Sequence, residues 1–113
     1  MLDRDAILSK RNDFPTETVH VPALGGDVAV GVLTTAELVG FYAAQDKLTD
    51  KGGTFAARLA VATVRDAAGG AMFTAEDVDA LNQLPWSALH PIVDVAMAIN
   101  GMTEKATPDA KKD

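Results

Sequence analysis

The chain has 113 residues, about the length that one hydrophobic core organises, so a single domain is expected. Sixteen acidic against ten basic residues give a formal net charge of −6, which would repel a phosphate backbone and argues against nucleic acid as a partner. The absence of cysteine excludes disulfide bonds, thiolate metal sites and cysteine nucleophiles. Residues 1–5 lack the apolar run of a signal peptide and no stretch reaches the roughly 20 apolar residues of a membrane span, so a soluble intracellular protein with no membrane partner is expected.

The composition predicts a modest core. Apolar residues make up 48% of the chain, but aromatic residues make up only 5%. Because each small side chain buries little area, the monomer is expected to be only marginally stable. Self-association would add the missing burial.

The N-terminal residues predict a short helix through Leu8. Asp3 can accept hydrogen bonds from the free amides of its first turn. The helix should end near Asn12–Asp13, because Phe14 precedes Pro15 and therefore favours an extended backbone.

The next segment predicts a β-hairpin. Thr16–Val21 alternates, with Val19 and Val21 on one side, and the turn over residues 23–27 holds two glycines that allow positive φ. Valines recur at every second position of the return strand, at 28, 30 and 32. A hairpin is not stable alone, so helices should cover its apolar face.

Two helices are predicted to follow. The first begins at a capping box formed by Thr34 and Glu37 and should fade at residues 51–53. Its apolar stripe is predicted to consist of Leu38, Phe41, Tyr42, Gln45 and Leu48. Thr54 is positioned to cap the second, which should turn Phe55, Leu59 and Ala62 inward and leave Arg58 and Arg65 in solvent. Turn residues at 66–70 leave either a small hairpin or a simple loop over 64–73.

Two further helices are predicted near the C-terminus. Thr74–Asp77 repeats the capping pattern and opens a short helix with Val78 and Leu81 inward. Pro85 suits the first turn of the last helix, which Pro91 should bend and Asn100–Gly101 should end. The inward face of that helix is predicted to be Trp86, Leu89, Val93, Ala96, Met97 and Asn100.

The expected fold class is therefore α+β and mostly helical. It comprises a short N-terminal helix, a β-hairpin and a bundle of about four helices, in one domain over residues 1–102. Residues 103–113 contain a proline, three lysines and no large apolar side chain, which predicts a disordered tail.

No group of residues predicts catalysis, a cofactor or a metal. His20 and His90 lack further ligands at helical spacing, whereas a zinc or iron site needs roughly three or four. The acidic residues at 76, 77 and 79 suit the first turn of a helix, and the glycine pairs at 25–26, 52–53 and 69–70 match no phosphate loop. Ser9 and Ser87 lack the surroundings of a nucleophile. Binding of other proteins, without catalysis, is the expected activity.

Two residues are candidates for such binding from their positions alone. Leu24 at the hairpin tip has little local core to enter and could contact a partner or another copy of the chain. Trp86 is expected in the core, because tryptophan is highly buried on average, with an exposed partner anchor as the alternative.

The order of motifs resembles the tail assembly chaperone family of long-tailed, siphovirus-type bacteriophages and prophages. The likeness covers almost all of residues 3–102. It is carried by Pro15–Pro22, Gly25–Gly26, Val28–Leu33, Thr34–Glu37, Arg58–Val64, Phe73–Leu81, Leu89–Ala98 and Asn100–Met102. The chain departs from the family at Leu24, where relatives often carry an aromatic residue, and at Ala67–Ala68, where they carry charged turn residues.

The resemblance implies a protein that acts in the host bacterial cytoplasm and is absent from the mature virion. It implies binding to the tape measure protein, which it keeps soluble, recruitment of tail tube protein, and assembly into a homo-oligomer. An adaptable helical surface that includes Met97 and Met102 is compatible with holding another helix, so Leu24, Trp86, Met97 and Met102 are the partner-binding candidates.

Two other functions stay open. One is a structural phage adaptor that is retained in the virion, such as a head–tail connector or minor tail protein. The other is a small enzyme or metal protein with an ordered pocket around His20 or His90.

Overall fold

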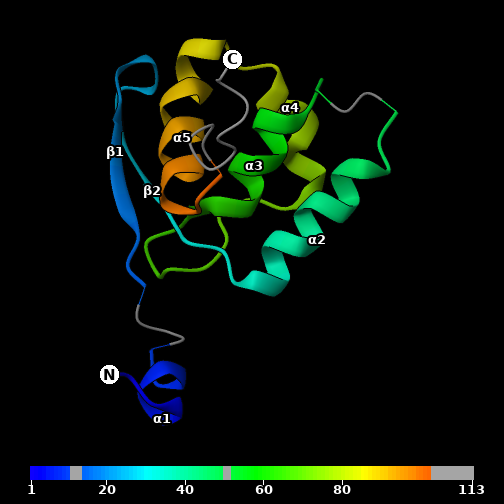
Figure 1. Ribbon diagram of the computed structural model, residues 1–113. Helices are drawn as coiled ribbons and strands as arrows, with labels where there is room; N and C mark the ends of the chain where they lie inside the picture. Colours follow the sequence, from blue (N-terminus) through cyan, green and yellow to red (C-terminus); the bar gives the residue numbers. More distant parts are fainter. Residues whose placement is uncertain (11–13, 50–51, 103–113) are drawn as a thin grey trace, which may run out of the picture.

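The computed structural model describes residues 1–10, 14–49 and 52–102 and confirms a mostly helical α+β fold (Figure 1). The helices are α1 (Arg4–Leu8), α2 (Thr35–Asp46), α3 (Phe55–Thr63), α4 (Val78–Asn82) and α5 (Trp86–Ile99). The strands are β1 (Glu17–Val21), β2 (Gly26–Val30) and β3 (Val64–Arg65), and the 3-10 turns are η1 (Pro22–Leu24) and η2 (Ala75–Asp77). The predicted tail over 103–113 lies outside the described residues.

The three strands form one antiparallel sheet in the order β1-β2-β3. Val19 lies opposite Val28 in the hairpin, and Val30 lies opposite Val64 at the other edge of β2. A single bridge joins Arg65 to Ala71. Residues 64–73 therefore form a short third strand and a loop that returns to pair with it. Of the two predicted alternatives, this is the small hairpin and not the simple loop. The return strand β2 ends at Val30, two residues before the predicted Val32.

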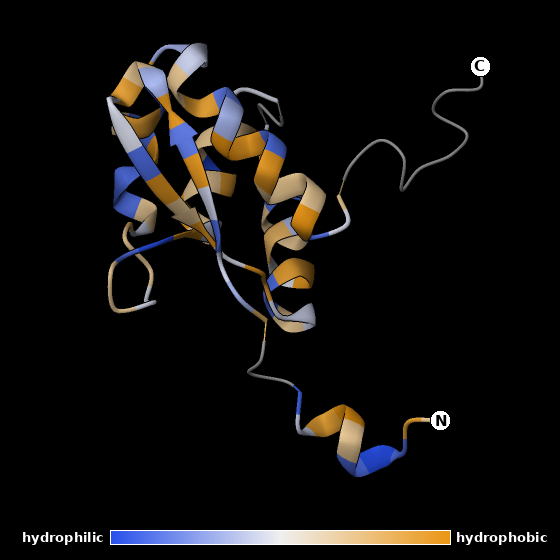
Figure 2. Cartoon of the chain, turned by 90° about the vertical axis from the view of Figure 1, so that its left-hand side faces the viewer, coloured by the Kyte–Doolittle hydropathy of each residue, from blue (hydrophilic) through white to orange (hydrophobic). Residues whose placement is uncertain are grey.

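The core lies between this sheet and the helices α5 and α3, which pack against each other (Figure 1). Figure 2 shows the alternation of apolar and polar residues along the strands that directs one face inward. The largest fully buried side chains are Val21, Val30, Leu59, Thr63 and Val64. The Thr63 hydroxyl donates to the carbonyl oxygen of Leu59 at 2.7 Å, which satisfies the one polar group among them.

Helix α5 follows the predicted pattern except at its first turn. Leu89, Val93 and Ala96 are buried, but Trp86 is 58% exposed, so the prediction that it lies in the core is wrong. The helix continues through Pro91 as one element. It ends at Ile99, with the predicted stop at Asn100–Gly101: Gly101 has a φ of 69°, and the next amide donates back to the Met97 carbonyl oxygen at 2.7 Å.

The interface between α2 and α3 corrects two predictions. Phe41 is buried and meets the ring of Phe55 edge-on at 5.7 Å, whereas Tyr42 is 44% exposed and does not belong to the inward stripe. Arg58 was predicted to lie in solvent, but it is half-buried against α2. Its guanidinium lies 4.6 Å from the centre of the Phe41 ring and donates to the side chain of Gln45. An arginine with a long apolar stem can cover a neighbouring ring while its charged group keeps hydrogen-bond partners.

The helix ends show which local signals the chain uses. The Asp3 carboxylate accepts from the amide of Ala6 at 2.9 Å, and Thr34 and Glu37 form the full capping box. Thr54 precedes α3 but its side chain makes no capping hydrogen bond, so that prediction is wrong. Helices α1 and α2 end at Leu8 and Asp46, earlier than predicted. The predicted stops at residues 12–13 and at residue 51 lie outside the described residues.

Candidate functional site

An apolar groove opens between the hairpin tip and the helices α3, α4 and α5. It encloses about 320 Å³, and its lining includes Leu24, Val28, Met72, Phe73, Leu84 and Leu89. Every lining side chain is apolar. Leu24 and Met72 are 46% and 50% exposed, so these two side chains are accessible to a partner. The groove has the chemistry of a site for aliphatic side chains and lacks groups for acid–base work.

The turn η1 positions Leu24 beside the groove. Pro22 starts a 3-10 turn directly after β1, and Gly25 ends it with a φ of 74°, a conformation that favours glycine. The Gly25 amide donates to the carbonyl oxygens of Val21 and Pro22, each at 3.0 Å. The tip therefore brings Leu24 next to the helices, whereas the sequence alone left it without a neighbouring apolar surface.

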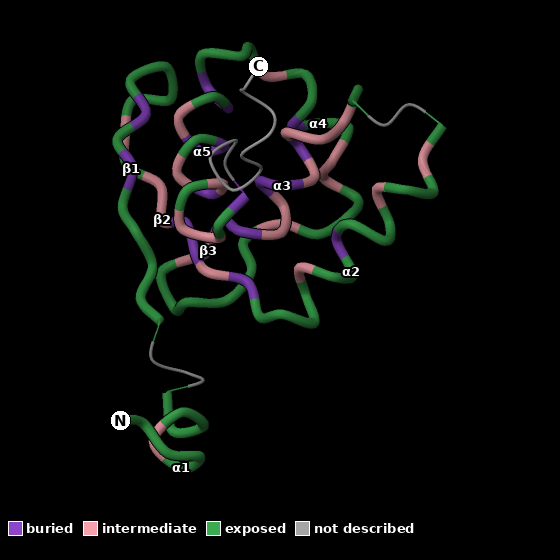
Figure 3. The backbone as a smooth tube through the Cα atoms, viewed as in Figure 1, coloured by how far each residue is buried: buried purple, intermediate pink, exposed green. Residues whose placement is uncertain are grey.

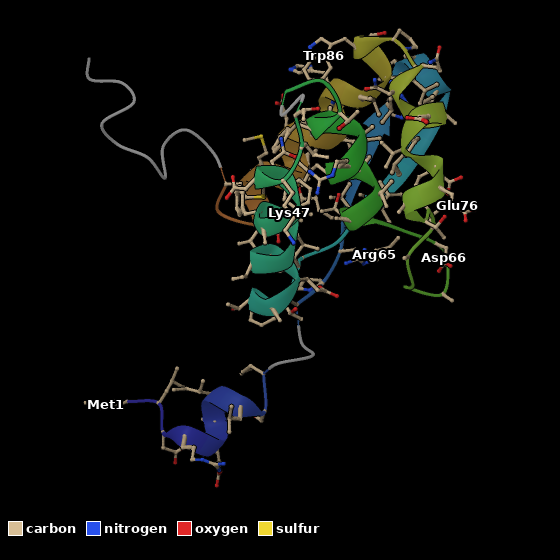
Figure 4. All side chains as sticks on the ribbon, turned by 90° about the vertical axis from the view of Figure 1, so that its right-hand side faces the viewer. Met1, Lys47, Arg65, Asp66, Glu76 and Trp86 are labelled. Carbon is tan, nitrogen blue, oxygen red and sulfur yellow. The ribbon has the colours of Figure 1, made fainter. Side chains whose placement is uncertain are left out.

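A loop closed by Asp66 positions Met72 and Phe73. One carboxylate oxygen of Asp66 accepts from the amides of Ala68 and Gly70, each at 2.9 Å, and the Asp66 amide donates to the Gly70 carbonyl oxygen at 2.8 Å (Figure 4). The Met72 amide then donates to the Val64 carbonyl oxygen at 3.2 Å. The chain thereby returns alongside β3. The sequence signal for this arrangement is an aspartate followed by two glycines and a short apolar run.

The structure separates the four predicted partner-binding residues. Leu24 lines the groove, and Trp86 is exposed two residues beyond the groove residue Leu84. Figure 4 shows Trp86 at the end of the molecule away from α1. Met97 is half-buried against the core and Met102 is 9% exposed within it. Met102 therefore stabilises the end of α5 and is not an accessible surface in this conformation.

Each histidine forms an exposed pair with an aspartate. His20 Nδ1 lies 2.8 Å from Asp27 Oδ1 across the hairpin, and His90 Nε2 lies 3.0 Å from Asp94 Oδ2 one helical turn away. The Trp86 ring also lies against His90, with ring centres 5.3 Å apart. The spacing of His90 and Asp94 was a signal in the sequence that the prediction missed. Among residues 1–10, 14–49 and 52–102, no three histidine, aspartate or glutamate side chains gather where they could hold a metal ion.

Of the acidic residues before α4, Asp77 caps with its carboxylate and Glu76 takes part through its backbone amide. The Thr74 amide donates to Asp77 Oδ2 at 2.9 Å, and the Thr74 hydroxyl accepts from the amide of Glu76 at 3.3 Å. This arrangement bears out the interpretation that the first helical turn explains these carboxylates, with the detail that the turn is the 3-10 turn η2.

No described helix combines the length and the apolar character needed to cross a membrane. Comparisons of the chain with protein-family models, with curated proteins and with solved structures found no match. The chemistry of the groove and the order of the sequence motifs are therefore the basis for a functional proposal.

Proposed function

We propose that the protein is a phage tail assembly chaperone and not an enzyme. It binds the tape measure protein in the host bacterial cytoplasm, keeps that protein soluble and helps recruit tail tube subunits. The observation that carries the proposal is the wholly apolar groove, with Leu24 and Met72 accessible beside it. The order of motifs from Pro15 to Met102 supports the choice of this family.

The size of the groove suits part of a helix. A volume of about 320 Å³ lies near the lower end of the range for ligand pockets, which holds a few aliphatic side chains and not a whole helix. A helix presents such side chains at spacings of roughly three and four residues along one face. Each copy would then cover one short apolar stretch, and many copies along one long partner would together shield its apolar segments.

The charge of the chain suits a chaperone that shields apolar segments. The net charge of −6 keeps a complex with an apolar partner in solution by repulsion between the complexes. The groove itself lacks charged side chains, so binding does not require a buried ion to lose its hydration.

Co-expression with the tape measure protein tests the proposal. The wild-type chain should raise the soluble fraction of that protein and co-purify with it, whereas Leu24→Asp/Met72→Asp should do neither, because two carboxylates would enter an apolar contact. Both side chains are about half exposed, so the double variant should still fold, as circular dichroism would verify. Val39→Asp is the matched control, since Val39 is 62% exposed on α2 and does not line the groove.

Equal activity of the groove variant and the Val39 variant would contradict the assignment of the groove. Mass spectrometry of purified virions gives a second, independent check. Stoichiometric amounts of the chain in the particle would contradict a transient chaperone and support the structural adaptor, such as a head–tail connector or minor tail protein.

A further inference from the structure

The N-terminal arm, defined as residues 1–10, has apolar side chains that its own domain does not bury. No residue of α1 is buried, Ile7 is 55% exposed and Leu2 is 67% exposed. Figure 1 and Figure 2 show α1 apart from the rest of the chain, with hydrophobic segments on its surface. Figure 3 shows no buried residue along it.

Such a short helix gains stability from packing. Helix α1 has five residues, and isolated helices shorter than about 12 to 15 residues are marginal in water. The apolar groove, whose side chains Leu24 and Met72 remain accessible, offers the kind of surface that the arm lacks. The arm and the groove are therefore complementary in chemistry.

The distribution of charge also favours this pairing. Residues 17–102 contain ten acidic and four basic side chains and thus account for the whole net charge of −6. Residues 1–16 contain three of each sign, with Arg4 before Ile7 and Lys10 after it. The neutral arm adds no like charge where it meets the acidic body, and the body of the second copy, which the arm holds farther away, is repelled less because salt screens charges beyond about 8–10 Å.

The direction of β1 favours a second copy over the chain's own arm. The arm precedes Glu17, which pairs with Val30, while the turn that holds Leu24 follows Val21 at the other end of the hairpin. An arm that binds its own groove must reverse direction and run back along β1. An arm that binds a neighbour needs no reversal.

We propose that the groove of one copy binds the N-terminal arm of a second copy, with Leu2 and Ile7 packing against Leu24 and Met72. The contact joins two different surfaces, the arm of one copy and the groove of the next, so successive copies form a ring or an open chain. Where two copies each place their arm in the other's groove, they form a closed pair. This contact goes beyond the proposed function: it shares the groove with it but does not require the tape measure protein.

Two complementary variants test the contact. The arm variant is Leu2→Asp/Ile7→Asp. A chain that lacks residues 2–10 serves as a second variant without the arm contact. The groove variant is Leu24→Asp/Met72→Asp. The altered side chains are exposed in each case, so both variants should fold. By sedimentation velocity, the mass of the wild-type chain should rise with concentration, and each variant alone should stay monomeric.

An equimolar mixture of the two variants should form a dimer, because one supplies an intact arm and the other an intact groove. Val39→Asp should associate like the wild type. The proposal is overturned if the mixture stays monomeric, if the arm variant alone associates like the wild type, or if the wild type is monomeric throughout.

Co-expression keeps this inference separate from the proposed function. An arm variant that still solubilises the tape measure protein shows that chaperone activity persists without self-association. Wild-type assembly and dimer formation in the mixture, without any effect on the tape measure protein, would instead contradict the proposed function and leave the arm contact supported.

Discussion

Asn100 is the residue that ties the end of α5 to the segment between β2 and α2. Its Oδ1 accepts from the Leu33 amide at 2.7 Å, and its Nδ2 donates to the Ala96 carbonyl oxygen at 2.9 Å and to that of Gly31 at 3.4 Å. One side chain thus satisfies backbone groups that lie 67 and 69 positions before it in the sequence. Removal of such a side chain leaves a partly buried amide without its partner.

Asn100→Ala should lower the free energy of unfolding by about 1–3 kcal/mol, the usual cost of a buried donor that loses its acceptor. Urea unfolding, followed by circular dichroism, measures this change. Asn82→Ala is the control: Asn82 is exposed at the end of α4, and its replacement should change the free energy by less than about 0.5 kcal/mol. Similar unfolding midpoints for the two variants would show that the Asn100 contacts contribute nothing measurable.

At the scale of the element, two helices with a threonine at the same position begin differently. The Thr34 hydroxyl accepts from the Glu37 amide at 3.0 Å, and the Glu37 carboxylate accepts from the Thr34 amide at 2.9 Å. Thr54 has φ −125° and ψ 13°, and its side chain makes no capping bond. Helix α2 buries only Phe41, so its cap matters more than that of the well-packed α3.

Thr34→Ala should therefore destabilise the protein by about 1 kcal/mol, the typical cost of a lost helix cap. Thr54→Ala should change the free energy of unfolding by less than about 0.5 kcal/mol. Denaturant midpoints compare the two, and amide exchange should speed up within α2 in the first variant only. A larger effect of the Thr54 variant would mean that capping does not determine the stability of α2.

At the scale of the whole molecule, the hydrophobic core and the excess negative charge both lie within residues 17–102. The buried residues extend from Val19 to Met102, whereas residues 1–10 contain none. The folding of the body should therefore be independent of the N-terminal arm, even though the arm is proposed to control assembly.

Deletion of residues 2–10 should leave the free energy of unfolding of the monomer unchanged within about 0.5 kcal/mol, since no buried contact is lost. The measurement is made at a concentration low enough to keep the wild-type chain monomeric, because association would add apparent stability. A loss above about 1 kcal/mol would mean that the arm packs on its own body and would refute its role as a free segment.

The sequence by itself determined the features that depend on neighbours along the chain. The Thr34–Glu37 box, the capping by Thr74 and Asp77 and the helix stop at Gly101 each involve residues within a few positions, and the structure confirms all three. The alternation of valines likewise predicted the inward face of the hairpin. Caps and alternation are local because the hydrogen bonds and side-chain directions that produce them are local.

Only the tertiary structure decided which apolar residues remain accessible. Trp86 continues the apolar stripe of α5 yet is exposed, Met102 follows the helix yet is buried, and Arg58 covers the ring of Phe41. The groove combines residues from the hairpin tip, the segment after β3 and the helices α3, α4 and α5, which no spacing in the sequence connects. Burial depends on which element packs against which, and that arrangement is set by contacts between distant parts of the chain.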